Sequence, residues 1–193
     1  MMRILHLVRH GSHAEVGHVL SGRSEIALDG RGRAEAAALA ARLGGTAVAS
    51  IHSSPRRRTR ETAEALAEGR GLPVHVAAAL DEIDFGAFAG RSFASLDRDP
   101  EWRRWNAERG SARCPGGETM ADAVARAAGY LAAIPADATP ALCVSHCDVI
   151  RGVVAHLLGL PFDRMFQLGC APASLTTIAI NGDDWRLQSL NLV

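Results

Sequence analysis

Short runs of apolar residues recur along the chain, and the first of them is followed at once by polar side chains. Residues 4–8 form this run, which stops at Arg9, His10 and Gly11. Apolar runs of this length are typical of strands that are buried on both faces at the centre of a parallel sheet. The pattern therefore predicts a buried strand with a cation and an imidazole at its carboxyl end, where open α/β sheets place ligands.

A second apolar run, residues 47–51, ends in small polar residues and leads into the arginine-rich segment 56–60. Ser54 and Pro55 predict the start of a helix there, with Ser54 as the N-cap and Pro55 at the first helical position. At helical spacing the arginines point in different directions, so a single inward-facing arginine, Arg58, is expected.

The third run, residues 141–144, ends at Ser145 and His146 and is followed by apolar residues at helical spacing. One cation and one imidazole at a strand end would indicate only that the strand reaches the surface, but the arrangement occurs three times. If the three strands are parallel and adjacent, His10, the arginines after Pro55 and His146 meet at one sheet edge. Imidazoles and guanidiniums near helix N-termini form an anion pocket, for which a phosphate dianion is the natural occupant.

The remaining pattern predicts one α/β domain over residues 1–193, built as a three-layer α/β/α sandwich with a mostly parallel central sheet. A small cap insertion is expected at about residues 80–114, where the pattern is irregular and aromatic residues are frequent. Between the first run and the first helix lies a long loop, which is usually functional in a compact domain. The other expected elements are helices at 29–43, 55–68 and 119–134, a short strand at 73–76, and a hairpin of 175–180 with 185–190.

Four motifs in this order resemble the signatures of the histidine phosphatase superfamily, the phosphoglycerate mutase-like enzymes. They are Val8-Arg9-His10-Gly11, Ser53-Ser54-Pro55 with Arg58 and Glu61-Thr62-Ala63, Glu82-Ile83-Asp84-Phe85-Gly86, and Val144-Ser145-His146. The resemblance runs from the first strand to the C-terminus. It implies that His10 is a nucleophile that forms a phosphohistidine, that Arg9 and Arg58 grip the phosphoryl oxygens, and that His146 donates to the same oxygens.

The same resemblance assigns Glu82 as the proton donor to the leaving alkoxide. A carboxylic acid in a partly dry pocket can have its pKa raised enough to remain protonated and donate. Asp81 and Asp84 stand beside it in the sequence and are competing candidates. A cluster of surface charges without catalytic meaning is the alternative for all three.

Further substrate contacts are expected from Ser21 and Gly22, which match a contacting pair in the mutases, and from the backbone of Cys147 at the start of a helix. His13 either adds a group to the pocket or lies exposed. Many relatives carry an acidic residue, Thr and Asn where this chain has Ser12, His13 and Val16. Loss of that Asn removes a phosphate contact and argues against the strict mutase branch.

The preferred function is therefore a phosphatase that hydrolyses a small phosphorylated metabolite. A cofactor-dependent mutase of the phosphoglycerate mutase type is the first alternative. It is disfavoured because a mutase needs an extended lid to protect its phosphoenzyme, and this cap is modest. A non-catalytic protein that binds a phosphorylated ligand is the second alternative. No cofactor and no metal are expected, because imidazoles and guanidiniums are poor ligands for magnesium.

The amino-acid composition limits the kinds of partner that the protein is expected to bind. The formal net charge is zero in 193 residues, so no global field attracts the protein to nucleic acid or to a membrane surface. The arginine run 56–60 is short and is followed by Glu61 and Glu64, which disfavours a nucleic-acid reading. Four scattered cysteines suggest neither a disulfide framework nor a zinc site and fit a reducing cytoplasm, where we expect a monomer or homodimer.

Overall fold

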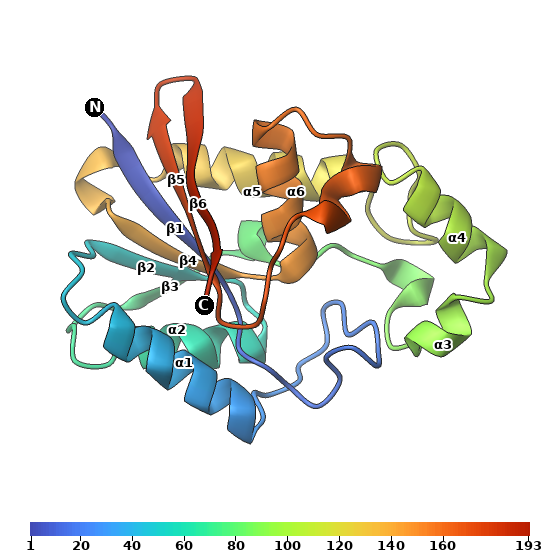
Figure 1. Ribbon diagram of the computed structural model, residues 1–193, viewed down its shortest axis with the longest axis horizontal. Coiled ribbons are helices and arrows are strands. Elements are labelled where there is room, and N and C mark those ends of the chain that lie inside the picture. The colour runs from blue at the N-terminus through green and yellow to red at the C-terminus, as the bar shows by residue number, and fades with distance from the viewer.

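The computed structural model describes residues 1–193 and places six strands in one sheet between two layers of helices (Figure 1). The order across the sheet is β3-β2-β4-β1-β5-β6, in which β3, β2, β4 and β1 are mutually parallel and β5 is antiparallel to β1. The strands are β1 (Arg3–Arg9), β2 (Ser50–Ser53), β3 (Val74–Val76), β4 (Ala141–Ser145), β5 (Leu175–Asn181) and β6 (Asp184–Leu192). The expected parallel neighbours are thus confirmed, with β4 between β1 and β2.

Helices cover both faces of this sheet, α1 and α2 on one and α5 and α6 on the other (Figure 1). The α-helices are α1 (Gly30–Arg42), α2 (Arg57–Ala67), α3 (Phe93–Leu96), α4 (Pro100–Ala107), α5 (Met120–Ala133) and α6 (Cys147–Leu157). None of them is both long and apolar enough to cross a membrane. The predicted three-layer α/β/α architecture is confirmed.

Side chains along the central strands alternate between the two faces of the sheet, and this alternation explains the three layers. Val8 and Val144 are buried in one cluster with apolar side chains of α1 and α2. Leu7 and Cys143, one residue earlier on each strand, are buried in another cluster with apolar side chains of α5 and α6. Successive side chains of a strand point to opposite faces, so a continuous apolar run fills both cores.

The segment between η1 (Ala78–Leu80) and α5 builds a third apolar cluster, beyond the carboxyl ends of β1 and β4 (Figure 1). Trp102 and Trp105 of α4 stack with ring centroids 5.2 Å apart, and Phe88 meets Trp102 edge to face. The cluster continues into α5 and α6, which joins this segment to the main body. We infer that it is the cap insertion expected near residues 80–114.

Two boundaries near the second strand were wrong in the sequence analysis. β2 begins at Ser50, three residues later than the apolar run, and α2 begins at Arg57 with Arg56 in the N-cap position. Ser54 does not cap the helix with its side chain, because its hydroxyl lies 2.8 Å from His146 Nε2 and donates to Asp81. The Ser54 amide donates to Val144 O, so the chain follows β4 beyond the end of β2 before the helix can start.

The other predicted elements lie within one or two residues of their expected ends. Asp29 caps α1 by accepting from the Gly32 amide, and Thr119 and Asp122 form a reciprocal capping box at the start of α5. The expected C-terminal hairpin is present as β5 and β6, at the edge of the sheet farthest from β3.

One buried imidazole makes the stability of this fold depend on pH. His52 on β2 lies 2.8 Å from both Ser50 Oγ and the Tyr130 hydroxyl, and its ring is 5.3 Å from that of His75. Burial and the neighbouring His75 lower the pKa of His52 to about 4. The unfolded chain therefore binds a proton that the folded protein resists, and stability should fall as the pH drops from about 6.5 towards 4.

Replacement of His52 by Asn tests this prediction. The decrease in the free energy of unfolding between pH 7.5 and pH 5 should be smaller in His52→Asn than in the wild type, as measured by denaturant titration. Other buried histidines contribute equally to the decrease in both proteins. The difference between the wild-type and His52→Asn decreases is therefore the contribution of His52. Equal decreases would show that this imidazole has no part in the acid sensitivity.

Candidate active site

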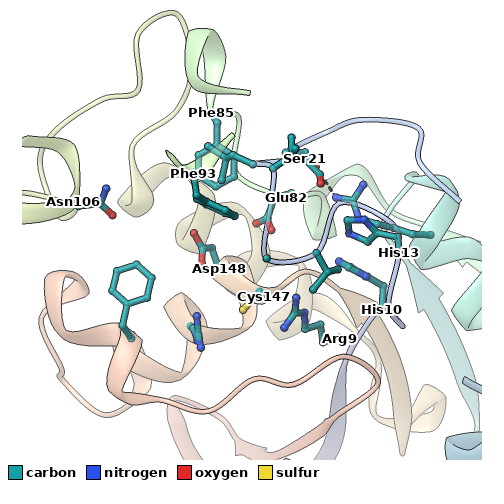
Figure 2. Close-up of a pocket in the computed structure, with 18 of the residues that line it drawn as sticks. Arg9, His10, His13, Ser21, Glu82, Phe85, Phe93, Asn106, Cys147 and Asp148 are labelled. Atoms are coloured by element: carbon teal, nitrogen blue, oxygen red, sulfur yellow. Dashed lines mark hydrogen bonds between the residues drawn. The ribbon is translucent and has the colours of Figure 1, made fainter. Parts of the chain in front are cut away.

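The end of β4 brings the predicted site residues together. The His10 amide donates to Ser145 O at 3.1 Å, and the Ser54 amide donates to Val144 O at 3.0 Å. The segments that follow β1 and β2 are therefore both tied to the end of β4, directly before His146. A cavity of about 380 Å³ opens at this edge, between the sheet and the cap (Figure 2).

Eight of the nine residues predicted from the sequence line this cavity: Arg9, His10, His13, Ser21, Gly22, Arg58, Glu82 and Cys147. The ninth, His146, lies directly behind the wall, with its ring centroid 5.3 Å from that of His10. Parts of the chain that are distant in sequence thus converge as the sequence analysis expected.

His10 is held in one orientation and one protonation state. Its Nδ1 lies 2.7 Å from Gly11 O, to which it donates, so the lone pair is on Nε2, which no protein group binds. Burial, reinforced by the charges of Arg58 and Arg9, holds the pKa of His10 well below its ordinary value. A neutral imidazole with an unoccupied nitrogen facing a cavity is the form required of a nucleophile.

The loop that carries His10 is fixed by a close backbone approach to α1. A Cβ on Gly11 would lie 2.5 Å from Gly32 O, and one on Gly32 would lie 2.0 Å from Ser12 O. The Gly11 amide donates to Thr62 Oγ1 of α2, and the Ser12 amide donates to Glu35 of α1. Only glycine fits at both positions, so this contact fixes where the His10 imidazole lies.

Arg58 is the only arginine of the run 56–60 that is buried, with 2% of its surface exposed. Its Nη1 donates to Ser24 O, and its Nη2 donates to Gly22 O and to His146 Nδ1. Its Nε is buried without a partner. The same is true of Arg9 Nε and His13 Nδ1, which lie on the same cavity. Buried Nε atoms without an acceptor on two guanidiniums suit an anion that supplies the missing acceptors.

His146 does not have the free nitrogen that was expected of a direct phosphate donor. Its Nδ1 accepts from Arg58 at 3.0 Å, and its Nε2 donates to Ser54 Oγ at 2.8 Å. The Ser54 hydroxyl in turn donates to Asp81 at 3.2 Å. Both ring nitrogens are therefore occupied within the protein, and in this arrangement His146 orients the Arg58 guanidinium.

Of the three neighbouring carboxylates, only Glu82 lines the cavity. Asp81 is turned away and pairs with Arg56, whose Nη2 lies 3.0 Å from its Oδ2. Asp84 accepts from the Gly86 amide and pairs with Arg23 at 3.3 Å. Among the three candidate proton donors that the sequence left open, the geometry thus favours Glu82 over Asp81 and Asp84.

Glu82 is buried and electrically unusual. Burial, followed by the negative charge of Asp148, raises the pKa of Glu82 to about 8. Its Oε1 accepts from the Ile83 amide at 3.0 Å, and Arg58 also favours the ionised form, but these opposing effects are smaller. At neutral pH the carboxyl group is therefore protonated and can donate.

His13 is buried, so the exposed alternative was wrong. Burial and the charge of Arg58 lower the pKa of His13 to about 4, which leaves it neutral. Cys147 begins α6 on the cavity wall, and its thiol lies 3.8 Å from Cys170 O, which also accepts from Arg9 at 2.6 Å. No three His, Cys, Asp or Glu side chains are grouped so as to hold a metal.

Sequence reasoning expected a cap rich in aromatic residues over the pocket, but it missed Asp148, Asn106 and Arg109, which α6 and the cap contribute to the cavity lining. Asp148 of α6 pairs with Arg109 at 3.0 Å. The half of the cavity formed by the cap and by α6 is also lined by Phe85, Phe93, Trp102, Arg151 and Phe166. Asp148 could have been identified, since it lies in the first helical turn after His146, whereas nothing in the sequence distinguishes Arg109 from other arginines.

Comparison with known proteins places this geometry in a family. Residues 5–193 match the family model of the histidine phosphatase superfamily (branch 1). The protein named "Probable phosphoglycerate mutase GpmB" of Salmonella choleraesuis is 30% identical over 188 residues, which cover 94% of this chain and 86% of that protein.

Two solved structures extend the likeness to three dimensions. A mycobacterial glucosyl-3-phosphoglycerate phosphatase is 30% identical, with a TM-score of 0.88 and all of both chains covered. The α-ribazole phosphatase from Shigella flexneri is 26% identical, with a TM-score of 0.86, covering 97% of this chain and 96% of that one. With a family match over nearly its whole length, this chain belongs to branch 1 of the histidine phosphatase superfamily.

Proposed function

We propose that this protein is a phosphatase that hydrolyses a small phosphomonoester through a phosphohistidine on His10, with Glu82 as the proton donor. One observation carries the proposal: the same cavity holds a neutral imidazole with an unoccupied Nε2 and a protonated carboxyl group. A cavity of about 380 Å³ suits a small molecule. Two of the similar structures are phosphatases by name, which supports the same reaction class.

In the first step, Nε2 of His10 attacks phosphorus. The N–P bond forms as the bond between phosphorus and the ester oxygen breaks, and the proton of Glu82 passes to that oxygen, so the alcohol leaves uncharged. Negative charge on the non-bridging oxygens is stabilised by Arg9 and Arg58, which are fixed in place before the substrate arrives. Preorganised donors of this kind are commonly the largest contribution to phosphoryl transfer.

In the second step, the Glu82 carboxylate accepts a proton from a water molecule whose oxygen attacks the phosphohistidine. The N–P bond breaks, inorganic phosphate leaves, and His10 and Glu82 return to their starting forms. Every proton and bond is accounted for by these two side chains, the ester and water. The arginines at this end of the cavity supply hydrogen-bond donors and positive charge, so the proposed route needs no metal.

A phosphomutase is the second candidate, because the Salmonella relative is named a phosphoglycerate mutase. The two reactions share the first step and differ in what attacks the phosphohistidine, which is water in one and a bound alcohol in the other. The cap consists of a 3₁₀ turn at Gly86–Phe88 and two short helices, α3 and α4, with their connecting segments. A small cap admits water to the phosphoenzyme, so we favour hydrolysis.

Replacement of His10 by Ala should abolish turnover of p-nitrophenyl phosphate by several orders of magnitude, because the covalent route is lost. After a rapid acid-free quench, the wild type should carry phosphate that is labile in acid, and the variant should carry none. Equal labelling of both proteins would exclude His10 as the nucleophile. If the folded wild type binds p-nitrophenyl phosphate but never hydrolyses it, the protein is a binding module.

Replacement of Glu82 by Gln should reduce the hydrolysis of glycerol 3-phosphate far more than that of p-nitrophenyl phosphate. General acid catalysis contributes about 10²–10⁴-fold, and a nitrophenolate needs little of it to leave. The matched controls are Asp81→Asn and Asp84→Asn, since neither side chain lines the cavity. A proton donor other than Glu82 is indicated if all three variants slow both substrates by the same factor.

A single assay separates the two reactions. With 3-phosphoglycerate and a trace of 2,3-bisphosphoglycerate, a phosphatase releases inorganic phosphate in proportion to the substrate consumed. A mutase instead produces 2-phosphoglycerate and releases almost no phosphate. We expect phosphate release with any phosphomonoester that is turned over, and sustained isomerisation without release would contradict the proposal.

A further inference from the structure

A second carboxylate, Asp148, lies on the same cavity wall as Glu82 and takes no part in the steps above (Figure 2). Its side chain is 13% exposed, and it stands in the first turn of α6. A negative charge is favoured at the N-terminus of a helix. The cavity therefore holds two carboxyl groups in different environments. Asp148 lies beside the backbone N–H groups of the helix start, whereas Glu82 is more deeply buried.

Arg109 of the cap holds Asp148 in this position. Its Nη1 lies 3.0 Å from Asp148 Oδ2, and its Nε and Nη2 donate to Asn106 Oδ1. The guanidinium lies 4.0 Å from the centre of the Trp105 ring and 4.3 Å from that of Phe166. A cation stacked between two rings and bound on its edge has little freedom, so the charge of Asp148 is fixed relative to Glu82.

Other charged and titratable groups also face Glu82. From α6 these are Asp148 and the thiol of Cys147, and from α2 the cation is Arg58. Asp81, the preceding residue, is turned away from the cavity and pairs with Arg56. The backbone oxygen of Glu82 accepts from both Arg23 and Arg126, which anchor the main chain at this point.

The remaining ionisable groups on the cavity are the imidazoles of His10 and His13 and the guanidiniums of Arg9, Arg109 and Arg151. His10 and His13 have pKa values below their ordinary range and carry no charge. Arg9 is tied to Cys170 O, and Arg151 is tied to Leu168 O. Among the groups around Glu82, Asp148 is the acidic one that lines the cavity with it.

We propose that Asp148 is a positioning residue for the proton donor: its negative charge, fixed by Arg109, keeps Glu82 in the acid form and sets the alkaline limit of activity. The two carboxyl groups thus have different functions: Glu82 is protonated and donates the proton, and Asp148 is ionised and favours that protonated form. This inference rests on the proposed role of Glu82. It also gives the cap a function beyond covering the cavity, since Arg109 belongs to the cap.

The test is the pH dependence of kcat/KM for glycerol 3-phosphate in Asp148→Asn. The alkaline limb should move to lower pH by about one unit, the size expected when one nearby charge is removed. Asp148→Glu retains the charge and should restore the limb towards its wild-type position. Asp163→Asn is the matched control, because it removes the same charge from an exposed position on η4 (Phe162–Gln167) and should leave the limb unchanged.

A direct measurement separates this inference from the proposed function. Infrared difference titration, with Glu82→Gln to identify the signal, should show that the Glu82 carboxyl titrates near pH 8 and at lower pH in Asp148→Asn. If the titration shifts but kcat/KM does not depend on Glu82, the catalytic role fails and the electrostatic one stands. If Asp148→Asn leaves the titration unchanged, the inference is wrong even where Glu82 remains the acid.

Thermal melting checks that the variants remain folded, because Asp148→Asn leaves Arg109 without a counter-charge in a buried site. If that variant is unstable, Asp148→Ser, which leaves space for water beside Arg109, provides the same test. A loss of rate in either variant with an unmoved alkaline limb would show that Asp148 is purely structural.

Discussion

The site depends on one strand end. β4 lies between β1 and β2, and the backbone oxygens of Val144 and Ser145 accept from Ser54 and His10. These bonds tie the chain after each neighbouring strand to the residue that precedes His146. Because the central strands are buried on both faces, none can slide without exposing apolar side chains. The core therefore fixes the positions of His10 and of His146, which orients Arg58.

Electrostatics is the second constraint, and it opposes stability. Arg58 and Arg109 are each about 2% exposed, and placing a guanidinium in such a site costs free energy that hydrogen bonds only partly return. Three imidazoles on or behind the cavity, those of His10, His13 and His146, remain neutral because nearby arginines and burial disfavour a further positive charge. In the proposed reaction, a phosphate dianion relieves this excess of positive charge, so its binding energy is generated beside His10.

The sequence predicted most of the half of the cavity around His10 and little of the half formed by the cap and α6. His10 and His146 each follow an apolar run that can be identified from the local sequence. Arg58 and Glu82 were located by the match to the family motifs. The true start of α2 could not be read from Ser54, because its hydroxyl is bound to His146 and Asp81, both distant in sequence. The occupied ring of His146 was equally invisible, since it follows from the packing of α2 against the end of β4.

The cap illustrates why the local sequence pattern does not identify the functional residues of that segment. Its aromatic side chains marked the cap in the sequence, and Trp102 and Trp105 do pack in one apolar cluster there. Arg109, however, has its position explained only by partners that are distant in sequence, among them the ring of Phe166 and the carboxylate of Asp148. A buried ion pair is seldom retained for stability alone, since apolar residues of similar volume are often as stabilising. Its position beside the buried carboxyl of Glu82 gives the pair a chemical reason to persist.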